Sequence, residues 1–317
     1  MNPTPSDVHV NAPLTNISVA WIQDQSEFIA DRVFPEVPVN KQSDRYFQYD
    51  KANWFRAKAL KRAPSTESAG SGFPLDNTPH YFCDVYAFHM DVDDDTRANA
   101  DAAIDVDRDA TEFVSRDLVL KREITWAATY FASSTWTGSS TGSDVTPSTL
   151  WDAAGSTPIE DLRTQLRSVK KNTGFRANKV TMGDPVWDTL QDHPDFLERI
   201  KYTQVAIVST GLLASVLGVD EVLVGGAVQN TAAEGAADAL SFLFDNDVLV
   251  SYAPARPGLM TPTAGYTFMW NGRVGGSMRV LRFRMEHLKS DRIEGEMAYD
   301  QKLVAADMGA FLLNVQS

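Results

Sequence analysis

Cysteine is almost absent from this chain. Cys83 is its single cysteine, so no disulfide can form within one copy, which is typical of proteins made in a reducing compartment. The 5 histidines show no metal-ligand spacing among themselves or with Cys83, and a zinc site is therefore not expected. We expect each histidine to have a structural or surface role.

Positive charge is also scarce. The chain carries 29 lysines and arginines against 42 aspartates and glutamates, a net charge of −13. Binding to nucleic-acid phosphates or to an anionic membrane needs a basic surface. No apolar run approaches the roughly 20 residues of a membrane span, and the first residues lack the basic and apolar segments of a secretory signal. The sequence predicts a soluble protein, made in a cytoplasm, that binds neither membranes nor specific nucleic-acid sequences.

Motifs for cofactors and catalysis are nearly missing as well. The chain contains no G-x-G-x-x-G and no phosphate-loop lysine motif, so no cofactor is expected. Residues 138–142 match G-x-S-x-G, the pattern that would make Ser140 the nucleophile of a serine hydrolase. That motif works only on a strained turn between a strand and a helix, whereas here it lies in a Ser/Thr/Gly-rich linker. We expect no enzyme, and a hydrolase using Ser140 is the alternative from another class.

Acidic residues are concentrated in one tract, which contains Asp91, Asp93, Asp94, Asp95, Asp101, Asp105, Asp107 and Asp109. Oxygen-rich clusters can bind calcium. In the first possible frame, however, Thr96 stands where a calcium loop needs glycine and Ala102 where it needs glutamate. We interpret Asp91–Asp109 as a solvated turn that leads into an acidic helix start, with weak cation binding left open.

A long excursion is predicted between Tyr46 and Val92. Aromatic, strand-like segments at residues 45–50 and 81–92 enclose nearly 30 residues that begin basic and end in a Pro/Ser/Gly tract. Unstructured stretches longer than about 15 residues are usually functional or disordered. A two-stranded excursion with a flexible middle is the simplest interpretation. Its basic cluster, Lys58, Lys61 and Arg62, is either a solvated loop or a contact with an acidic neighbour such as a second copy.

The clearest helix is predicted over residues 105–131. Apolar residues follow a three/four spacing there, and the aspartates before it suit the positive end of the helix dipole. At 1.5 Å per residue it would span about 40 Å. From this spacing we expect the core-facing side chains to include Phe113, Leu120, Ile124 and Phe131.

The remaining segments predict an α+β protein. A short helix is expected over residues 25–33, ending before Pro35. After the linker 133–147, helices and strands alternate in a compact unit at about 150–255. Its helices are expected at 158–171, 185–191, 194–202 and 211–217, and its strands at 179–182, 221–224 and 247–251. Strands at 278–286, 293–299 and 310–315 would close the fold.

Two segments carry a resemblance to a known family. Residues 28–39, FIADRVFPEVPV, are followed by YFQY at 46–49, and the chain has DQKLVAADMGA at 300–310. With the order of elements, these segments resemble the major capsid proteins of tailed bacteriophages, which share the Hong Kong 97 type fold. The local matches are moderately specific, and the order of elements covers nearly the whole chain.

The resemblance implies a division of the chain. Residues 1–40 would be an N-terminal arm, 41–93 the E-loop and 150–255 the axial domain. Residues 94–149 and 256–317 would form the peripheral domain, with the long helix as its spine. Candidate contacts between subunits in the E-loop are Trp54, Phe55, Arg56, Lys58, Lys61, Arg62 and Phe73.

The resemblance also implies a function and partners. The chain is expected to assemble with itself, as hexamers and pentamers, into an icosahedral phage head that encloses double-stranded DNA, and so to reside in the virion after assembly in the host cytoplasm. Portal and decoration proteins would be further partners, and because the chain begins at the arm, scaffolding would come from a separate protein. An encapsulin-like protein compartment and a monomeric binding module are the alternatives.

Overall fold

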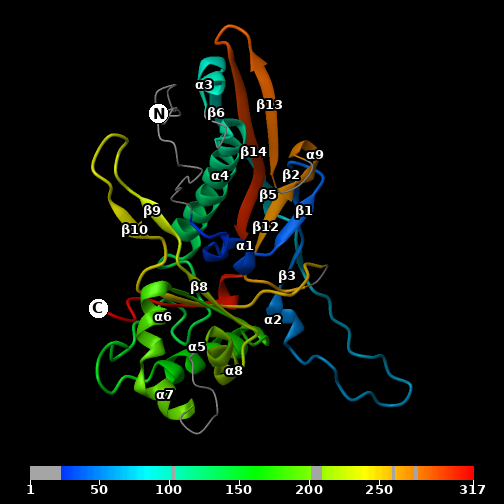
Figure 1. Cartoon of the computed structure of the whole chain (residues 1–317). Coiled ribbons are helices and arrows are strands. Elements are labelled where there is room, and N and C mark those ends of the chain that lie inside the picture. The colour runs from blue at the N-terminus through cyan, green and yellow to red at the C-terminus, as the bar shows by residue number, and fades with distance from the viewer. Residues whose placement is uncertain (1–22, 101–103, 201–208, 259–260, 275–277) are drawn as a thin grey trace.

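The computed structural model describes residues 23–100, 104–200, 209–258, 261–274 and 278–317. Two parts are evident in Figure 1: a long sheet with one long helix lying along it, and a compact unit of shorter helices and strands. A thin ribbon and a separate hairpin project from the body. None of the helices in these described ranges combines the length and hydrophobicity that a bilayer crossing requires.

The long sheet is organised around β14 (Ser290–Leu303). β6 (Asp84–Asp93) pairs antiparallel with it from Tyr299 back to Ser290, and β13 (Arg279–Met285) and β12 (Gly265–Trp270) pair with other stretches of β14. β1 (Glu36–Val39) adds to β12 in parallel. The predicted strands at 81–92, 278–286 and 293–299 are confirmed by these elements.

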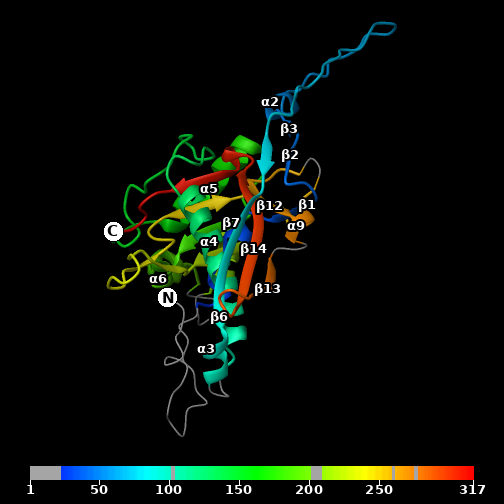
Figure 2. The ribbon, with the colours of Figure 1, turned by 90° about the horizontal axis from the view of Figure 1, so that it is seen from above.

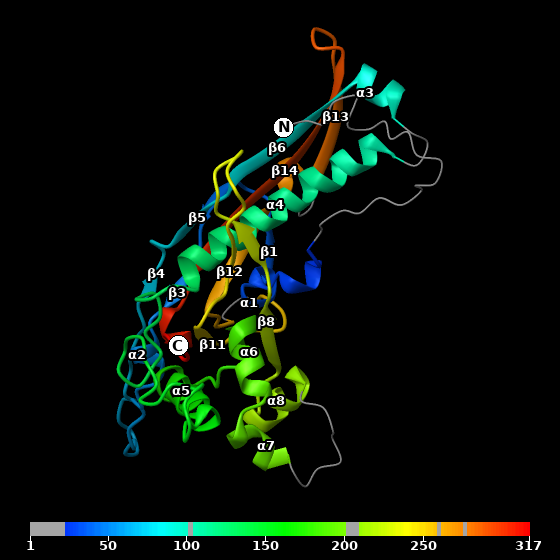
Figure 3. The same ribbon diagram turned by 60° about the vertical axis from the view of Figure 1, so that its left-hand side comes forward.

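The long helix α4 (Val106–Tyr130) runs along one face of this sheet (Figure 3). The Asp105 side chain caps it by accepting from the backbone N–H of Arg108, and Asp107 and Asp109 occupy its first turn, where acidic side chains favour the helix dipole. A shorter helix, α3 (Asp94–Asn99), precedes it. The predicted helix over 105–131 is confirmed almost to the residue.

The predicted buried face of α4 is partly wrong. Phe131 is buried and Leu120 packs against the same cluster, but Ile124 is only half-buried and the Phe113 side chain is 56% exposed. The apolar positions that the helix buries are Val106, Ala110, Val114, Leu118, Trp126 and Ala127.

The cause is the close approach of α4 to one glycine of the sheet. A Cβ on Gly295 of β14 would lie 2.7 Å from Val114 Cγ1 and 2.8 Å from Leu118 Cδ1. The helix therefore turns Val114 and Leu118 onto the sheet, and Phe113 is left at its flank with its ring 5.7 Å from that of Phe88. The spacing pattern identifies Phe113 as one of the apolar residues of α4. Which apolar residues are buried depends on how the helix packs against the sheet.

This geometry predicts unequal effects of truncation on α4. Leu118→Ala should lower the free energy of unfolding by about 2–5 kcal/mol because it empties a packed site. Phe113→Ala should cost less than about 1 kcal/mol in the isolated subunit, since the ring is largely solvated. Urea unfolding of the two variants tests this, and equal losses would contradict the assignment of the buried face.

The compact unit is a four-stranded sheet covered by helices. Its strand order is β15-β11-β7-β8, with β7 and β8 parallel and the other pairs antiparallel. The strands are β7 (Lys179–Gly183), β8 (Glu221–Gly225), β11 (Val248–Ser251) and β15 (Gly309–Leu312). The helices are α5 (Pro158–Thr173), α6 (Asp184–Gln191), α7 (Pro194–Ile200) and α8 (Thr210–Leu217). These confirm the predicted elements, except that residues 201 and 202 of the third helix lie outside the described ranges.

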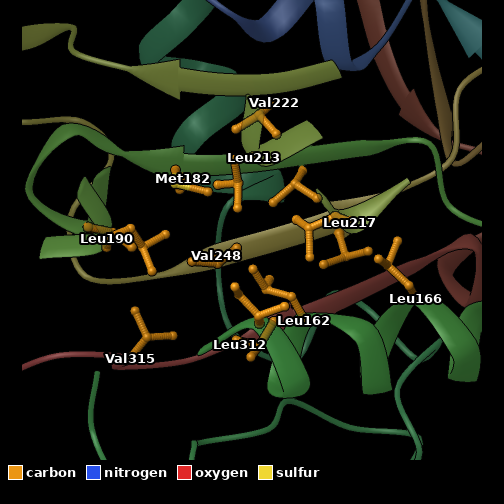
Figure 4. Packing of buried hydrophobic residues seen from close by; sticks show 14 of the residues in the cluster. Leu162, Leu166, Met182, Leu190, Leu213, Leu217, Val222, Val248, Leu312 and Val315 are labelled. Carbon is orange, nitrogen blue, oxygen red and sulfur yellow. The ribbon is translucent and has the colours of Figure 1, made fainter. Parts of the chain in front are cut away.

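Apolar side chains from both layers converge between this sheet and its helices. Figure 4 shows Leu162 and Leu166 of α5 facing Val248 of β11 and Leu217 of α8. The α5 helix begins with Pro158 at its first turn and ends at Gly174, whose φ of 79° is the left-handed cap that glycine adopts easily. The predicted bounds of this helix rest on the same two signals.

The end of the chain corrects the predicted domain boundary. β15 pairs with β11, and Leu312 lies opposite Val248. Residues 309–312 therefore belong to the sheet of the compact unit, not to the part assigned to 256–317. A short 3₁₀ turn, η2 (Ala306–Met308), makes the passage from β14 into this sheet.

The segment before β1 forms two short turns instead of one helix. These are η1 (Gln25–Glu27) and α1 (Ala30–Val33), and the chain leaves the helical conformation at Phe34, as the following proline predicts. The predicted arm before residue 23 lies outside the described residues. Two elements remain to be described. They are α9 (Asn271–Val274) and a projecting hairpin of β9 (Val228–Asn230) and β10 (Leu240–Phe242).

Candidate assembly surface

The most prominent surface feature is the part of the predicted excursion that leaves the body, residues 43–82, here called the ribbon. Two short ladders hold its arms together: β2 (Ser43–Arg45) with β5 (His80–Phe82), and β3 (Gln48–Tyr49) with β4 (Leu75–Asp76). Beyond them lie the short helix α2 (Lys51–Trp54) and a long loop, which Figure 2 shows reaching far from the body. The predicted two-stranded excursion is confirmed as a structure.

An aromatic cluster forms where the arms separate. The ring centroids of Trp54 and Phe73 are 5.4 Å apart, and Tyr49 lies within 6.1 Å of Trp54. Trp54 is nevertheless 52% exposed and Phe73 56%. Large apolar side chains left partly exposed on a projecting element are typical of interaction sites.

The base of the ribbon is attached to the end of β14. Gln48 Nε2 donates to the carbonyl of Val304 at 3.2 Å, and Lys51 forms an ion pair with Asp307. The Phe55 ring packs over Gly174, where a Cβ would lie 3.0 Å from it. These contacts fix the direction of the ribbon at its base.

The basic side chains of the ribbon differ in their surroundings. Lys58 Nζ donates to Asn53 Oδ1 at 3.0 Å and to Ser71 Oγ at 2.7 Å, so it links the two arms. Arg62 donates to the backbone of Thr66. Neither Arg56 nor Lys61 forms an ion pair with a carboxylate in the described ranges, and both are exposed. Sequence reasoning grouped Lys58, Lys61 and Arg62 as one basic cluster and did not foresee the internal link through Lys58.

Arginines from the other end of the chain and from within the tract pair with its aspartates. Arg284 contacts both oxygens of Asp94 at 2.6 Å, Arg292 contacts those of Asp91 at 2.7 and 2.8 Å, and Arg97 lies 2.8 Å from Asp107. The neighbouring arginines lower the pKa of Asp94 and of Asp91. Within the described ranges, which omit Asp101, no group of acidic, histidine or cysteine side chains is arranged to hold a metal ion. The tract therefore serves as one half of an ion-pair network between β6, α3, α4, β13 and β14.

Comparison with known sequences finds similarity to phage capsid proteins. Residues 139–261 match the model of a family described as phage major capsid protein E. The chain is 22% identical over 311 residues to the major capsid protein of Burkholderia phage BcepMu, with 96% of each covered. It is 25% identical to the major capsid protein of Pseudomonas phage JBD67, again with 96% of each covered.

Several solved structures share the fold of this chain. A phage-related protein from Bordetella bronchiseptica RB50 matches with a TM-score of 0.69, 20% identity, and 92% of this chain and 93% of that one covered. The capsid of cyanophage P-SCSP1u matches with a TM-score of 0.63 at 11% identity, covering 98% of both chains. The SrpI encapsulin of Synechococcus elongatus PCC 7942 matches with a TM-score of 0.56 at 11% identity, covering 97% of this chain and 94% of that one.

The predicted resemblance is confirmed. The chain has the Hong Kong 97 type fold, and the two sequence relatives that match 96% of it are phage major capsid proteins.

A buried glutamate in the middle of the long helix of this capsid fold was missed from the sequence. Glu123 is 2% exposed, and its Oε1 accepts from the backbone N–H of Ile29 at 2.8 Å and of Ala30 at 3.2 Å. Burial raises its pKa to about 7. The adjacent Arg122 lies 2.7 Å from Glu36. Together they fasten the segment before β1 onto α4; the only sequence signal was a charged pair inside an apolar stripe.

The G-x-S-x-G motif proves to have a packing role at its first glycine. Gly138 N–H donates to the Gly309 carbonyl at 2.8 Å, and a Cβ on Gly138 would lie 2.4 Å from the carbonyl oxygens of Asp307 and Gly309. Ser140 is exposed in the loop between α4 and α5, not on a strand-to-helix turn. Among the described residues, its side chain makes no hydrogen bond to a histidine.

We therefore expect Gly138→Ala to destabilise the subunit by about 1–3 kcal/mol, because the clash is with backbone that cannot move aside easily. Gly70→Ala is the matched control, since nothing lies within 4 Å of a Cβ at Gly70. Thermal unfolding of both variants distinguishes them. A Gly138→Ala variant as stable as the control would contradict this packing.

Two further candidate reactive groups, His193 and Cys83, are embedded in structure. His193 lies 2.8 Å from Ser156 Oγ and its Nδ1 accepts from the N–H of Asp195, so it joins two loops of the compact unit. Cys83 is fully buried, and burial raises the pKa of its thiol to about 12. A thiol in this state is unreactive near neutral pH.

Proposed function

We propose that copies of this chain assemble, as hexamers and pentamers, into an icosahedral phage head that encloses double-stranded DNA. The observation that carries the proposal is the ribbon: an ordered base, an exposed aromatic cluster and a tip that its own subunit does not use. A two-stranded ribbon is marginal in water without a packing partner. A second copy is the partner whose chemistry fits, since the chain is strongly acidic and the ribbon tip is basic.

The parts of the fold take the following roles in this proposal. The ribbon is the E-loop, α4 is the spine helix, and the long sheet with α4 is the peripheral domain. The compact unit, with β15 added, is the axial domain. Contacts between copies involve Trp54, Phe55, Arg56, Lys61, Arg62 and Phe73, and Lys58 contributes by holding the ribbon's arms together.

The partners in this proposal follow from charge and location. At −13 per copy, the shell would enclose DNA without sequence-specific binding, because phosphate contacts need a basic surface. Scaffolding, portal and decoration proteins are further expected partners, and assembly takes place in the host cytoplasm.

We also infer that the chain is not an enzyme; covalent labelling of Ser140 by a fluorophosphonate would contradict this.

Negative-stain microscopy of the purified chain tests the proposal. Closed shells or capsomer rings would support it, whereas monomers at every concentration would overturn it in favour of a binding module. The contents of the particles separate a phage head from an encapsulin-like compartment, the alternative that the likeness to the SrpI encapsulin favours. Packaged DNA from infected cells supports the first, and a protein cargo the second.

Assembly should depend on salt. Bringing together copies that each carry −13 costs electrostatic repulsion, which salt screens over a Debye length of about 10 Å at 0.1 M. Light scattering should therefore show faster assembly as ionic strength rises from about 10 mM to about 150 mM. Assembly that is indifferent to salt over this range would contradict the expectation.

A further inference from the structure

A polar cavity lies between the C-terminal half of α4 and β14. Its volume is about 230 Å³. It opens where β6 stops accompanying β14: the last paired residues are Asp84 and Tyr299, and β14 continues to Leu303 without that neighbour. The cavity is therefore built by the divergence of the ribbon's second arm from the sheet.

The walls combine aromatic faces with carboxylates. Tyr86 and Tyr299 stack with centroids 4.7 Å apart, and Asp84 and Asp300 lie beside them. Asp300 Oδ2 accepts from the N–H of Phe82 at 2.8 Å. Lys302 is the only cation of the lining and lies 3.5 Å from the same oxygen, so the lining carries two carboxylates and one ammonium.

One buried amide in this wall lacks partners. Gln301 is 7% exposed, and neither its Oε1 nor its Nε2 is hydrogen-bonded to a described residue. Its backbone carbonyl, in contrast, accepts from the Tyr130 hydroxyl. A buried amide left unpaired costs free energy, and a polar ligand that pairs with it would remove that cost.

We propose that this cavity binds a guanidinium or alkylammonium group. The negative wall charge and the tyrosine faces favour a cation, and the free Gln301 Oε1 and carboxylate oxygens are acceptors for several donors at once. Guanidinium fits best because it is planar and presents five N–H donors. Two sources share this chemistry: a basic side chain of a second copy, or a free amine.

The chain itself carries suitable groups. Arg56 and Lys61 are exposed on the ribbon and have no carboxylate partner among the described residues. That source rests on the proposed shell function, because one subunit's ribbon points away from its own body (Figure 2). The binding chemistry of the cavity does not rest on it, and the two are tested separately.

The first experiment titrates the unassembled full-length subunit at low salt with methylguanidinium, followed by ligand-observed NMR. N-methylurea, its neutral near-isostere, is the matched probe. Methylguanidinium should bind at one site, and N-methylurea should not. Binding of both probes alike, or of neither, would overturn the proposal.

Variants locate the site. Gln301→Met removes the amide while keeping the volume, and Asp84→Asn removes one exposed charge; each should weaken methylguanidinium binding about tenfold. Asp192→Asn changes the net charge equally on an exposed loop remote from α4 and should leave binding unchanged. Gln301→Met should also melt no lower than wild type, because it removes an unpaired polar group. Unchanged binding in both cavity variants would sink the assignment.

A second experiment distinguishes the sources. Subunits carrying Lys61→Cys are mixed with subunits carrying Thr129→Cys at the cavity wall, assembled, and treated with a short bismaleimide; the native Cys83 is buried. A cross-linked pair, absent when Asp192→Cys replaces Thr129→Cys, supports a second copy as the source. Binding of methylguanidinium without this cross-link supports a free amine. Shells without any methylguanidinium binding would overturn the cavity proposal and leave the shell function standing.

Discussion

Replacing residues 59–70 with a short Gly/Ser turn is expected to abolish stable shells and to leave the subunit folded. The replaced residues are exposed, and the link from Lys58 to Ser71 is retained. Free energy of unfolding should change by less than about 0.5 kcal/mol, as for other changes to solvated surface. Circular dichroism and thermal unfolding report on the subunit, and negative-stain microscopy on the shells.

Limited proteolysis of the wild type provides the control for this variant. The ribbon tip should be cut in the free subunit and protected after assembly, because an exposed loop tip is a preferred site of cleavage until a partner covers it. Normal shells from the shortened variant would show that the ribbon is not an assembly element. Loss of folding in that variant would show that the tip supports its own subunit.

Glu123→Ala should be among the most damaging single changes to the subunit. It would leave the buried N–H groups of Ile29 and Ala30 without an acceptor, at a cost of roughly 2–4 kcal/mol. Urea unfolding measures the loss. The control is Glu123→Gln, which keeps the Oε1 acceptor and should lose much less; equal losses in the two variants would contradict the clamp.

The same residue gives the stability a pH dependence. The pKa of Glu123 is raised from 4.5 to about 7 by burial, with Asp31 acting in the same direction and Arg122 against it. The folded state therefore holds its proton more tightly than the unfolded state. This contribution is fully present below pH 4.5 and is lost as pH rises through about 7. The free energy of unfolding of the wild type should fall over this range relative to that of Glu123→Gln; parallel profiles would refute it.

Local signals in the chain were enough to predict its helices and strands and their order. α4 begins at its Asp105 cap, α5 lies between Pro158 and Gly174, and the chain leaves its helical turn before Pro35. Each of these signals depends on a few neighbouring residues, so it can be recognised in the sequence without knowledge of the fold. The ribbon could be predicted for a related reason. Its polar middle buries too little apolar surface to offset the conformational entropy that it would lose on ordering within one subunit.

Which residues contact one another depends on how the elements pack. The close approach of α4 to Gly295 makes Val114 and Leu118, and not Phe113, the buried face of the helix. Pairing with β11 places residues 309–312 in the compact unit. Asp94 found its partner in Arg284, 190 residues away along the chain. The sequence spaced the residues along each element, but pairing across such distances depends on how whole elements pack, and no local pattern encodes it.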